Sequence, residues 1–353
     1  MNVTFTVAAP HENDYFTTVI PAMLDIASNA PSGDGLYSLV YFARTWDPST
    51  KEDILRICLL PKGGKYAVCR RIEGLLRKNG LVDFSFAEEL EYPPLWNAGF
   101  SGSRFAQTSI AIYEAATRWM VKLASRWSGL QVTRPPLRDA IQTMVWHGRA
   151  SLDSSLYKNL DGFENSQLLS LRLLSYRSHY EAAYARSANP AGLDRFCSRA
   201  YEELGGVARQ AVAAASKPRT CWNRDIPGSW YAVVATCHEK IRTALANGDL
   251  FDVSRTREDL ERALGRELEP TRFHARLTEP IRYLLYQDLD FLAYRFETSL
   301  LYSVLYTLGY PLSLRYVLCN LVAQANEDES NKSAMKLREE LEAFATSLYH
   351  AHS

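Results

Sequence analysis

The segments LYSLVYFAR (Leu36–Arg44) and DILRICLL (Asp53–Leu60) are two apolar, aromatic-rich runs that flank a short polar segment at Thr45–Thr50. Two such runs around a turn signal predict a β-hairpin. Val3–Val7 alternates apolar and polar residues and predicts a strand before the hairpin, and Val82–Leu90 predicts a strand after it. These four strands are expected to form one sheet.

Two helices are expected between the strands. Glu12–Ala27 has apolar residues at helical spacing, and a helix that opens at Gly63–Gly64 runs to Lys78, where Asn79–Gly80 ends it. The order strand, helix, strand, strand, helix, strand fits a ferredoxin-like sheet with its helices on one face. We therefore predict an α+β fold in which this sheet (residues 1–92) packs with a large, mainly helical region (residues 93–353), together forming a single enzyme.

The helices expected in the second region are Arg104–Ser125, Leu137–Trp146, Ser166–Tyr184, Gly192–Ala215, Trp230–Leu245, Arg257–Leu264, Phe273–Leu308 with a possible break, Leu312–Ala325 and Asn331–Tyr349. Lys217–Gly228 is expected to be a loop because it holds Pro, Arg and Trp residues.

Composition narrows the classes of function. The 353 residues are 47% hydrophobic, and 40 basic residues balance 40 acidic ones, so there is no overall basic field to favour nucleic acid. The sequence has no apolar stretch long enough to span a membrane and no secretory signal. Its six cysteines are scattered without a C-x-x-C pair, which is typical of reduced, buried thiols in the cytoplasm and does not favour a zinc site.

Common catalytic motifs do not fit. Gly63-Gly64-Lys65 is too short for a phosphate-binding loop, and Gly99–Ser103 lacks the spacing of a nucleophile elbow. The seven histidines include no i, i+4 pair with a carboxylate, so we do not expect a metalloenzyme.

Four segments follow one another along the chain in an order that matches a family pattern. They are a strand and an apolar-Pro-apolar helix (Val3–Val7, Val19–Leu24), a hairpin (Tyr41–Arg44, Ile54–Cys58), a Tyr-Pro step and Gly-containing turn (Glu91–Pro94, Gly99–Gly102), and a late helix (Ser299–Tyr306). In this order they resemble the C-terminal elimination domain of lanthipeptide dehydratases, and more closely its stand-alone thiopeptide relatives. The resemblance frames almost the whole chain except residues 128–270.

The departures from the elimination pattern matter most. That family holds a glutamate leaving group with hairpin arginines and moves a proton with a late His. In this chain Cys58 stands at the second arginine position, Tyr302 at the His position, and Tyr306-Thr307 at the following Asn-Arg pair. Loss of an anion clamp and of a near-neutral base disfavours glutamate elimination. The sequence is similar to thiopeptide pyridine synthases, which use the fold for a formal [4+2] cycloaddition.

The resemblance implies a dehydrated, azole-containing precursor peptide that still carries its leader. One dehydroalanine tautomerises to a 2-azadiene, a second adds to it, and water and the leader amide are lost to give a pyridine. No cofactor is implied, and a homodimer is left open. The alternatives are a glutamate-eliminating subunit of a split dehydratase and a noncatalytic leader-binding scaffold.

Candidate site residues follow from the chemistry. The tautomerisation needs an uncharged donor and acceptor, which Tyr302 and Ser299 supply from one helical face. The other expected catalytic residues are Glu91, a possible general base at the end of the fourth predicted strand, and Tyr294. The substrate-binding candidates are Arg44, Arg56, Tyr306, Glu297, Asp288, Trp96 and Trp222, and the leader-binding candidates are Arg70, Arg71, Arg77 and Lys78. Each also has an ordinary explanation as a core tyrosine, a surface charge or a core aromatic residue.

Overall fold

The computed structural model describes residues 2–30, 35–47, 52–88, 99–159, 162–217, 226–253, 261–262, 265–267, 271, 273–274 and 277–352. The chain forms two compact units. The first comprises Met1–Asn97, Arg104–Pro136 and Ser299–Leu312, and the second comprises Ala98–Ser103, Leu137–Thr298 and Ser313–Ser353. Helix α10 (Leu289–Thr307) contributes its residues up to Thr298 to the second unit and its remaining residues to the first.

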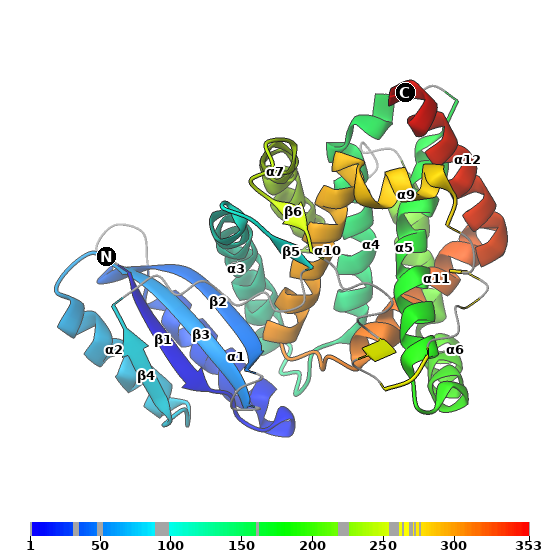
Figure 1. Cartoon of the computed structure of the whole chain (residues 1–353). Coiled ribbons are helices and arrows are strands. Elements are labelled where there is room, and N and C mark those ends of the chain that lie inside the picture. Colours follow the sequence, from blue (N-terminus) through cyan, green and yellow to red (C-terminus); the bar gives the residue numbers. More distant parts are fainter. Residues whose placement is uncertain are drawn as a thin grey trace. The chain divides into compact units, whose positions relative to one another are not determined.

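The first unit contains a four-stranded antiparallel sheet. Its strands are β1 (Val3–Ala8), β2 (Tyr37–Asp47), β3 (Glu52–Pro61) and β4 (Phe84–Ala87), in the order β2-β3-β1-β4 (Figure 1). With one helix after β1 and another after β3, this is the ferredoxin-like order. The predicted α+β class and the predicted strand order are therefore confirmed.

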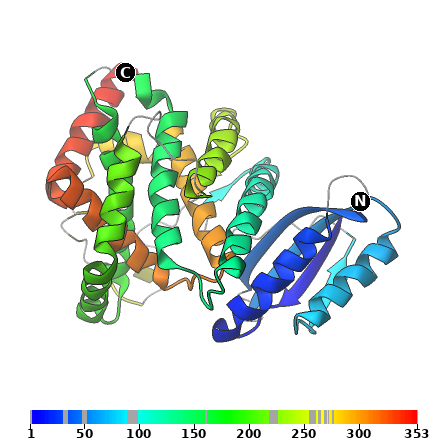
Figure 2. The ribbon, with the colours of Figure 1, turned by 180° about the vertical axis from the view of Figure 1, so that it is seen from behind.

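Helices α1 (Glu12–Ser28) and α2 (Lys65–Lys78) run across one face of this sheet (Figure 2). The alternation of β1 explains why, because its apolar side chains Phe5 and Val7 are fully buried on that face. The guanidinium carbon of Arg77 on α2 lies 5.1 Å from the ring centre of Phe84, which pairs with Val7. Helix α3 (Phe105–Gly129) packs against α1 and β2 and completes the core of the unit.

The hairpin is longer than predicted. Strand β2 continues to Asp47, with Trp46 opposite Asp53 and Asp47 opposite Glu52, so the prediction that a turn begins at Thr45 is wrong. Cross-strand pairing outweighs the turn signal of the sequence at this point. Strand β4 begins at Phe84, two residues after the predicted start.

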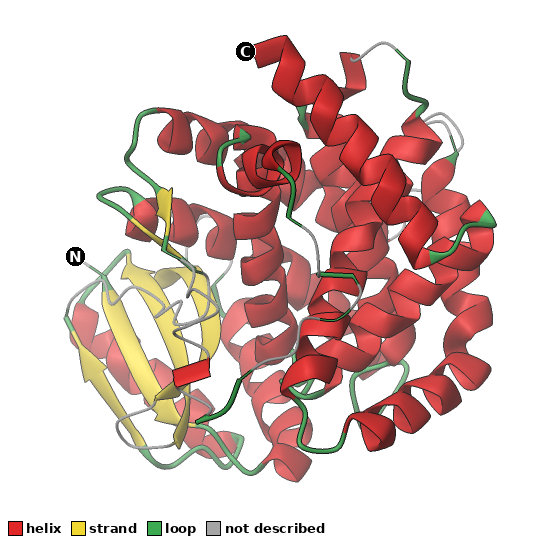
Figure 3. Ribbon diagram, turned by 45° about the vertical axis from the view of Figure 1, so that its right-hand side comes forward, coloured by secondary structure: helices red, strands yellow, loops and turns green. Residues whose placement is uncertain are grey.

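The second unit is helical in nearly all of its described length (Figure 3). Its helices are α4 (Leu137–Ser154), η1 (Leu156–Asn159), α5 (Asn165–Arg186), α6 (Pro190–Ser216), α7 (Ile226–Ala246), α9 (Glu279–Tyr286), the first part of α10, α11 (Leu314–Ser330) and α12 (Ala334–His352). Each predicted helix from Leu137 to Leu245 is present with shifted ends. Most of the helix predicted over 257–264 lies outside the described residues.

The helix predicted over Phe273–Leu308 is broken between α9 and α10. The break falls at Gln287–Asp288, because the carboxylate of Asp288 accepts a hydrogen bond from the backbone N–H of Phe291 at 2.8 Å and so caps the start of α10. Two short strands were not predicted, β5 (Phe100–Ser101) and β6 (Phe251–Asp252), which pair antiparallel within this unit.

Candidate functional site

Helix α10 presents a partly open polar face in the first unit. Ser299 and Tyr302 are half-buried, whereas Leu300 and Leu301 between them are fully buried. The i, i+3 spacing puts the two hydroxyls on one face of the helix, as the sequence predicted, and Tyr306 lies one turn further along. The structure therefore places both predicted hydroxyls away from the closed core.

A cluster around Arg44 anchors the end of α10. The Nη2 atom of Arg44 lies 2.6 Å from Oδ2 of Asp53, and the Tyr306 hydroxyl donates a hydrogen bond to the other carboxylate oxygen. The guanidinium carbon stacks between two rings, 3.9 Å from the centre of Tyr15 and 4.1 Å from that of Tyr306. Burial raises the pKa of Tyr306, and the hydrogen bond to Asp53 adds to the rise, so Tyr306 stays a neutral donor.

The free edge of β2 is closed by hydroxyl groups. The backbone N–H of Phe42 donates to Oγ1 of Thr117 at 3.2 Å, and that of Arg44 donates to Oγ1 of Thr307 at 2.9 Å. The hydroxyl of Tyr15 donates to the carbonyl oxygen of Thr307 at 2.9 Å. These bonds satisfy buried strand donors and fix the last turn of α10 to β2 and α1.

The two arginines predicted to orient substrate carbonyls lie on opposite faces of the sheet. Arg44 is opposite Leu55, whereas Arg56, on the adjacent strand, is opposite Ala43, and residues directly opposite share a face. Arg44 is only 3% exposed and already holds Asp53, which favours a structural role. Of the two, Arg56 is the one with a partly exposed side chain.

Neutral groups line the sheet face that carries Arg56. Tyr41 and Cys58 share this face, and the ring of Tyr41 lies 6.0 Å from that of Tyr113. Burial raises the pKa of Tyr113, and the hydroxyl of Ser303 opposes part of that rise. Burial also raises the pKa of Cys58 to about 11, so its thiol is protonated near neutral pH.

Three other predicted residues lie buried in the second unit. Asp288 caps α10 and accepts a hydrogen bond from the hydroxyl of Tyr157. The hydroxyl of Tyr294 lies 2.6 Å from Oγ of Ser175, and burial raises its pKa. Glu297 is 3% exposed. Asp288, Tyr294 and Glu297, which were predicted as weaker candidates on the same segment, thus belong to the second unit, whereas Ser299 and Tyr302 belong to the first.

A buried ion cluster around His238 was not predicted from the sequence. Nδ1 of His238 lies 3.0 Å from Glu297 and Nε2 lies 3.1 Å from Asp290, so each ring nitrogen faces a carboxylate and both are protonated. Burial opposes the charge, but the two carboxylates outweigh it and raise the pKa of His238 to about 9. The one sequence signal was a His on the apolar face of α7, among Val234, Cys237 and Ile241.

A second buried histidine, His147, is neutral, whereas His238 is charged. Trp230 donates from Nε1 to Nδ1 of His147 at 3.3 Å, so the proton lies on Nε2, 3.0 Å from Oγ1 of Thr298. Burial and the nearby Arg172 lower the pKa of His147 to about 3. The guanidinium carbon of Arg172 lies 4.6 Å from the ring centre of Tyr294. These groups pack together in the interior of the helical unit.

The predicted leader-binding residues are exposed on the first unit. Lys78 lies 2.9 Å from Asp25, and Arg71 donates a hydrogen bond to Asn29. Arg70 and Arg77 are also exposed on α2. The leader-binding role stays a prediction, as do the catalytic and substrate-binding roles. Glu91, Trp96 and Trp222 lie outside the described residues.

Cys58, Cys69, Cys197, Cys237 and Cys319 are free and buried, as predicted, and Cys221 lies outside the described residues. Among the described residues, no cluster of three or more His, Cys, Asp or Glu side chains could hold a metal ion. No helix in the described part of the chain is long and apolar enough to cross a membrane.

The chain is similar to known proteins in its three-dimensional structure, but no match was found from its sequence. No protein-family model and no curated protein matches the sequence. The crystal structure of TsrL is similar over 96% of this chain and 98% of that chain, with 18% identity and a TM-score of 0.66. The pyridine synthase TbtD from thiomuracin biosynthesis is similar over 93% of this chain and 98% of that chain, with 17% identity and a TM-score of 0.55.

A third structure is that of the tRNA-dependent lantibiotic dehydratase MibB from Microbispora sp. 107891. It is matched over 94% of this chain and 28% of that chain, with 14% identity and a TM-score of 0.43, which is too low to indicate a shared fold. The chain has the fold of TsrL and of the pyridine synthase TbtD across nearly the whole length of both. The fold implied by the sequence resemblance is therefore confirmed.

Proposed function

We propose that this chain is a cofactor-free, peptide-modifying enzyme of the cytoplasm that forms the six-membered nitrogen ring of a thiopeptide. In this reaction two dehydroalanines of a leader-bearing peptide combine in a formal [4+2] cycloaddition, and water and the leader are then lost. The likeness to the pyridine synthase TbtD over almost the whole chain supports this reaction class.

One observation carries the proposal. From Ser299 to Thr307, α10 offers only hydroxyls as polar side-chain groups, and three of them, those of Ser299, Tyr302 and Ser303, belong to partly exposed residues. A hydroxyl both donates and accepts a hydrogen bond without carrying a charge. This suits the shift of an amide to its iminol, which needs one proton delivered and one removed at neighbouring atoms.

Positioning of the two dehydroalanines would supply most of the rate enhancement. Holding two alkenes face to face can contribute roughly 7–11 kcal/mol. Proton transfer assisted by Tyr302 and Ser299 would add a factor of about 10²–10⁴. Tyr306, held by Asp53 and stacked on Arg44, fixes the helix that carries both hydroxyls. In the later eliminations Tyr302 would donate a proton to a leaving group.

The main alternative, elimination of glutamate, has less support from the site. That reaction needs a cationic clamp for a carboxylate and a group that titrates near neutral pH. The thiol of Cys58 is neutral and buried at one expected clamp position, and Arg44 is committed to Asp53. A noncatalytic scaffold remains the second alternative.

One assay distinguishes the three functions. The purified protein is incubated with a leader-bearing peptide that contains two dehydroalanines, and mass spectrometry follows the loss of water and leader. Tyr302→Phe should slow product formation about 100-fold, while Tyr66→Phe, at a residue 69% exposed on α2, serves as the matched control. Conversion of a glutamylated peptide instead would favour elimination, and peptide binding without any product would favour the scaffold. An unchanged rate for Tyr302→Phe would refute the assigned role of Tyr302.

A further inference from the structure

A half-enclosed cavity of about 130 Å³ lies inside the second unit, whereas the proposed hydroxyl pair belongs to the first. Most of its wall is apolar and comes from α5, α9, α10 and α12. The apolar residues that line it are Leu171, Leu174, Phe273, Leu277, Ile281, Leu285, Phe291 and Leu341. Leu277 is 46% exposed, so apolar surface is also accessible to solvent beside the cavity.

The charged part of the lining is cationic. Arg295 and Arg338 both line the cavity, and none of the described residues that line it carries a carboxylate. Nη1 of Arg295 lies 2.7 Å from Asp252, which offsets part of its charge, and Nε of Arg338 donates to the carbonyl oxygen of Phe273 at 3.3 Å. A ligand with an anionic group beside its apolar part would complement this lining.

Two histidines complete the wall as neutral groups. The ring nitrogens of His274 lie 2.9 Å from Oγ of Ser178 and 3.2 Å from Oγ1 of Thr271, which fixes the ring. Burial and Arg338 lower the pKa of His274, and burial together with neighbouring arginines lowers that of His179 to about 3. Near neutral pH the positive charge of the lining therefore comes from the two arginines.

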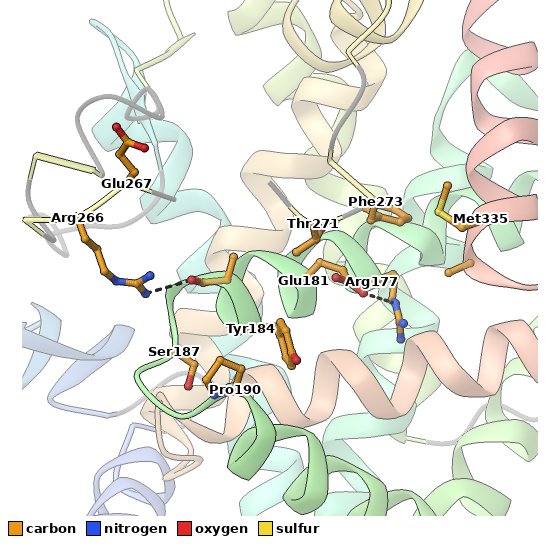
Figure 4. A pocket seen from close by; sticks show the side chains of 12 residues that line it. Arg177, Glu181, Tyr184, Ser187, Pro190, Arg266, Glu267, Thr271, Phe273 and Met335 are labelled. Carbon is orange, nitrogen blue, oxygen red and sulfur yellow. Dashed lines mark hydrogen bonds and ion pairs between the residues drawn. The ribbon is translucent and has the colours of Figure 1, made fainter. Parts of the chain in front are cut away.

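A larger open groove of about 680 Å³ shares Phe273 with the cavity. Figure 4 shows this groove, with Tyr184 and Pro190 on one side and Phe273 and Met335 on the other. Arg266 crosses part of it and donates to the carbonyl oxygen of Ala185 at 3.1 Å. The volume lies within the range of about 300–1,000 Å³ that ligand pockets commonly have.

We infer that the groove and the cavity together dock a segment of the peptide substrate, with one leucine- or phenylalanine-sized side chain in the cavity and an adjacent acidic residue near Arg338 and Arg295. Size supports the anchor, because an apolar cavity of roughly 150 Å³ holds one benzene ring. The open groove, which shares Phe273 with the cavity, favours a chain over a free small acid, since a small acid would occupy the cavity alone. The inference rests on the proposed function in taking the peptide substrate as the ligand.

Short fluorescent peptides test the ligand class by anisotropy without requiring catalysis. The first peptide contains Leu between two Asp residues, the second has Leu replaced by Ala, and the third has both Asp residues replaced by Asn. Both changes should weaken binding by about tenfold, the first through lost apolar burial and the second through lost charge pairing. Equal affinity for all three would overturn the inference, and so would equal binding of N-acetyl-leucine, because that result would point to a free acid.

Protein variants locate the site. Leu277→Asp places a carboxylate on exposed surface beside the cavity and should weaken the first peptide about tenfold, whereas the isosteric Leu277→Asn should weaken it much less. Leu285→Phe narrows the cavity and should also weaken binding. If neither variant changes anisotropy while the protein still makes the pyridine product, the docking site is wrong and the function stands. If the variants weaken binding but the wild-type protein makes no pyridine product, the docking site stands and the proposed function is wrong.

Discussion

His238 should make the helical unit lose stability as the pH rises. In the folded chain its pKa is raised from 6.5 to about 9, because Asp290 and Glu297 outweigh the effect of burial. Below the ordinary pKa, His238 is protonated in both the folded and unfolded states, and its stabilising contribution is fully present. Between about pH 6.5 and pH 9 only the folded state keeps the proton, so stability falls as the pH rises.

The size of the effect follows from the pKa difference. One pKa unit corresponds to about 1.4 kcal/mol, so a rise from 6.5 to about 9 gives a loss of roughly 3 kcal/mol across this range. His147 and His179 act below this range, because the pKa of each is lowered to about 3 and only their unfolded forms take up protons as the pH falls. Stability should therefore be greatest near pH 6.5.

Urea unfolding at a series of pH values measures this dependence. The midpoint should fall steadily from about pH 7 to pH 9, and the protection factors of amides in α7, which correct for the base-catalysed rise of the intrinsic exchange rate, should fall over the same range if the helical unit is responsible. Trp230, which donates to His147, supplies a fluorescence probe within this unit.

Two variants test whether the pH dependence of stability comes from the ion cluster around His238. Glu297→Gln keeps an acceptor near Nδ1 but removes one charge and so lowers the folded-state pKa of His238, and the alkaline loss of stability should therefore be smaller and end at a lower pH. His350→Gln changes an exposed histidine on α12 and should leave the profile as it is. A midpoint that stays constant from about pH 7 to pH 9, or an unchanged profile in Glu297→Gln, would refute the charged state assigned to His238.

Three further changes test other parts of the structure. Gly102→Ala should destabilise the second unit by at least about 2 kcal/mol in urea unfolding, because Gly102 has φ +136° and a Cβ atom would lie 2.2 Å from the carbonyl oxygen of Asp249; wild-type stability would contradict the close approach. Thr307→Val should cost about 1–3 kcal/mol in urea unfolding of the first unit, because it removes the acceptor of a buried N–H on β2; an unchanged midpoint would show that this bond contributes little. Reversing charge at Arg70 and Arg71 should weaken binding of an acidic leader and reduce its salt dependence, and unchanged affinity in a titration would exclude α2 as the leader contact.

The sequence predicted the fold well where periodicity and short-range signals agree. The alternation in Val3–Val7 and the two hairpin runs were enough to place the sheet, and its order follows from the two intervening helices. The end of β2 was missed because Thr45 and Trp46 gain their stability from pairing with β3. The strands β5 and β6 were missed because two residues carry no periodicity, and their partner segments are far apart in the chain.

The candidate site was predicted from the sequence less completely than the fold. Periodicity correctly put Ser299 and Tyr302 on one face of α10, since that relation depends only on helical geometry. The same reasoning grouped Glu297 with them, yet Glu297 is directed to His238, 59 residues earlier in the chain. No local pattern encodes that contact. An acidic residue in an apolar helix must find a cation or lose its charge, so the sequence did imply a buried partner for Glu297. A histidine on the apolar face of another helix was the available partner, and pairing such isolated polar residues before assigning them to a substrate would have separated the structural cluster from the open hydroxyl face.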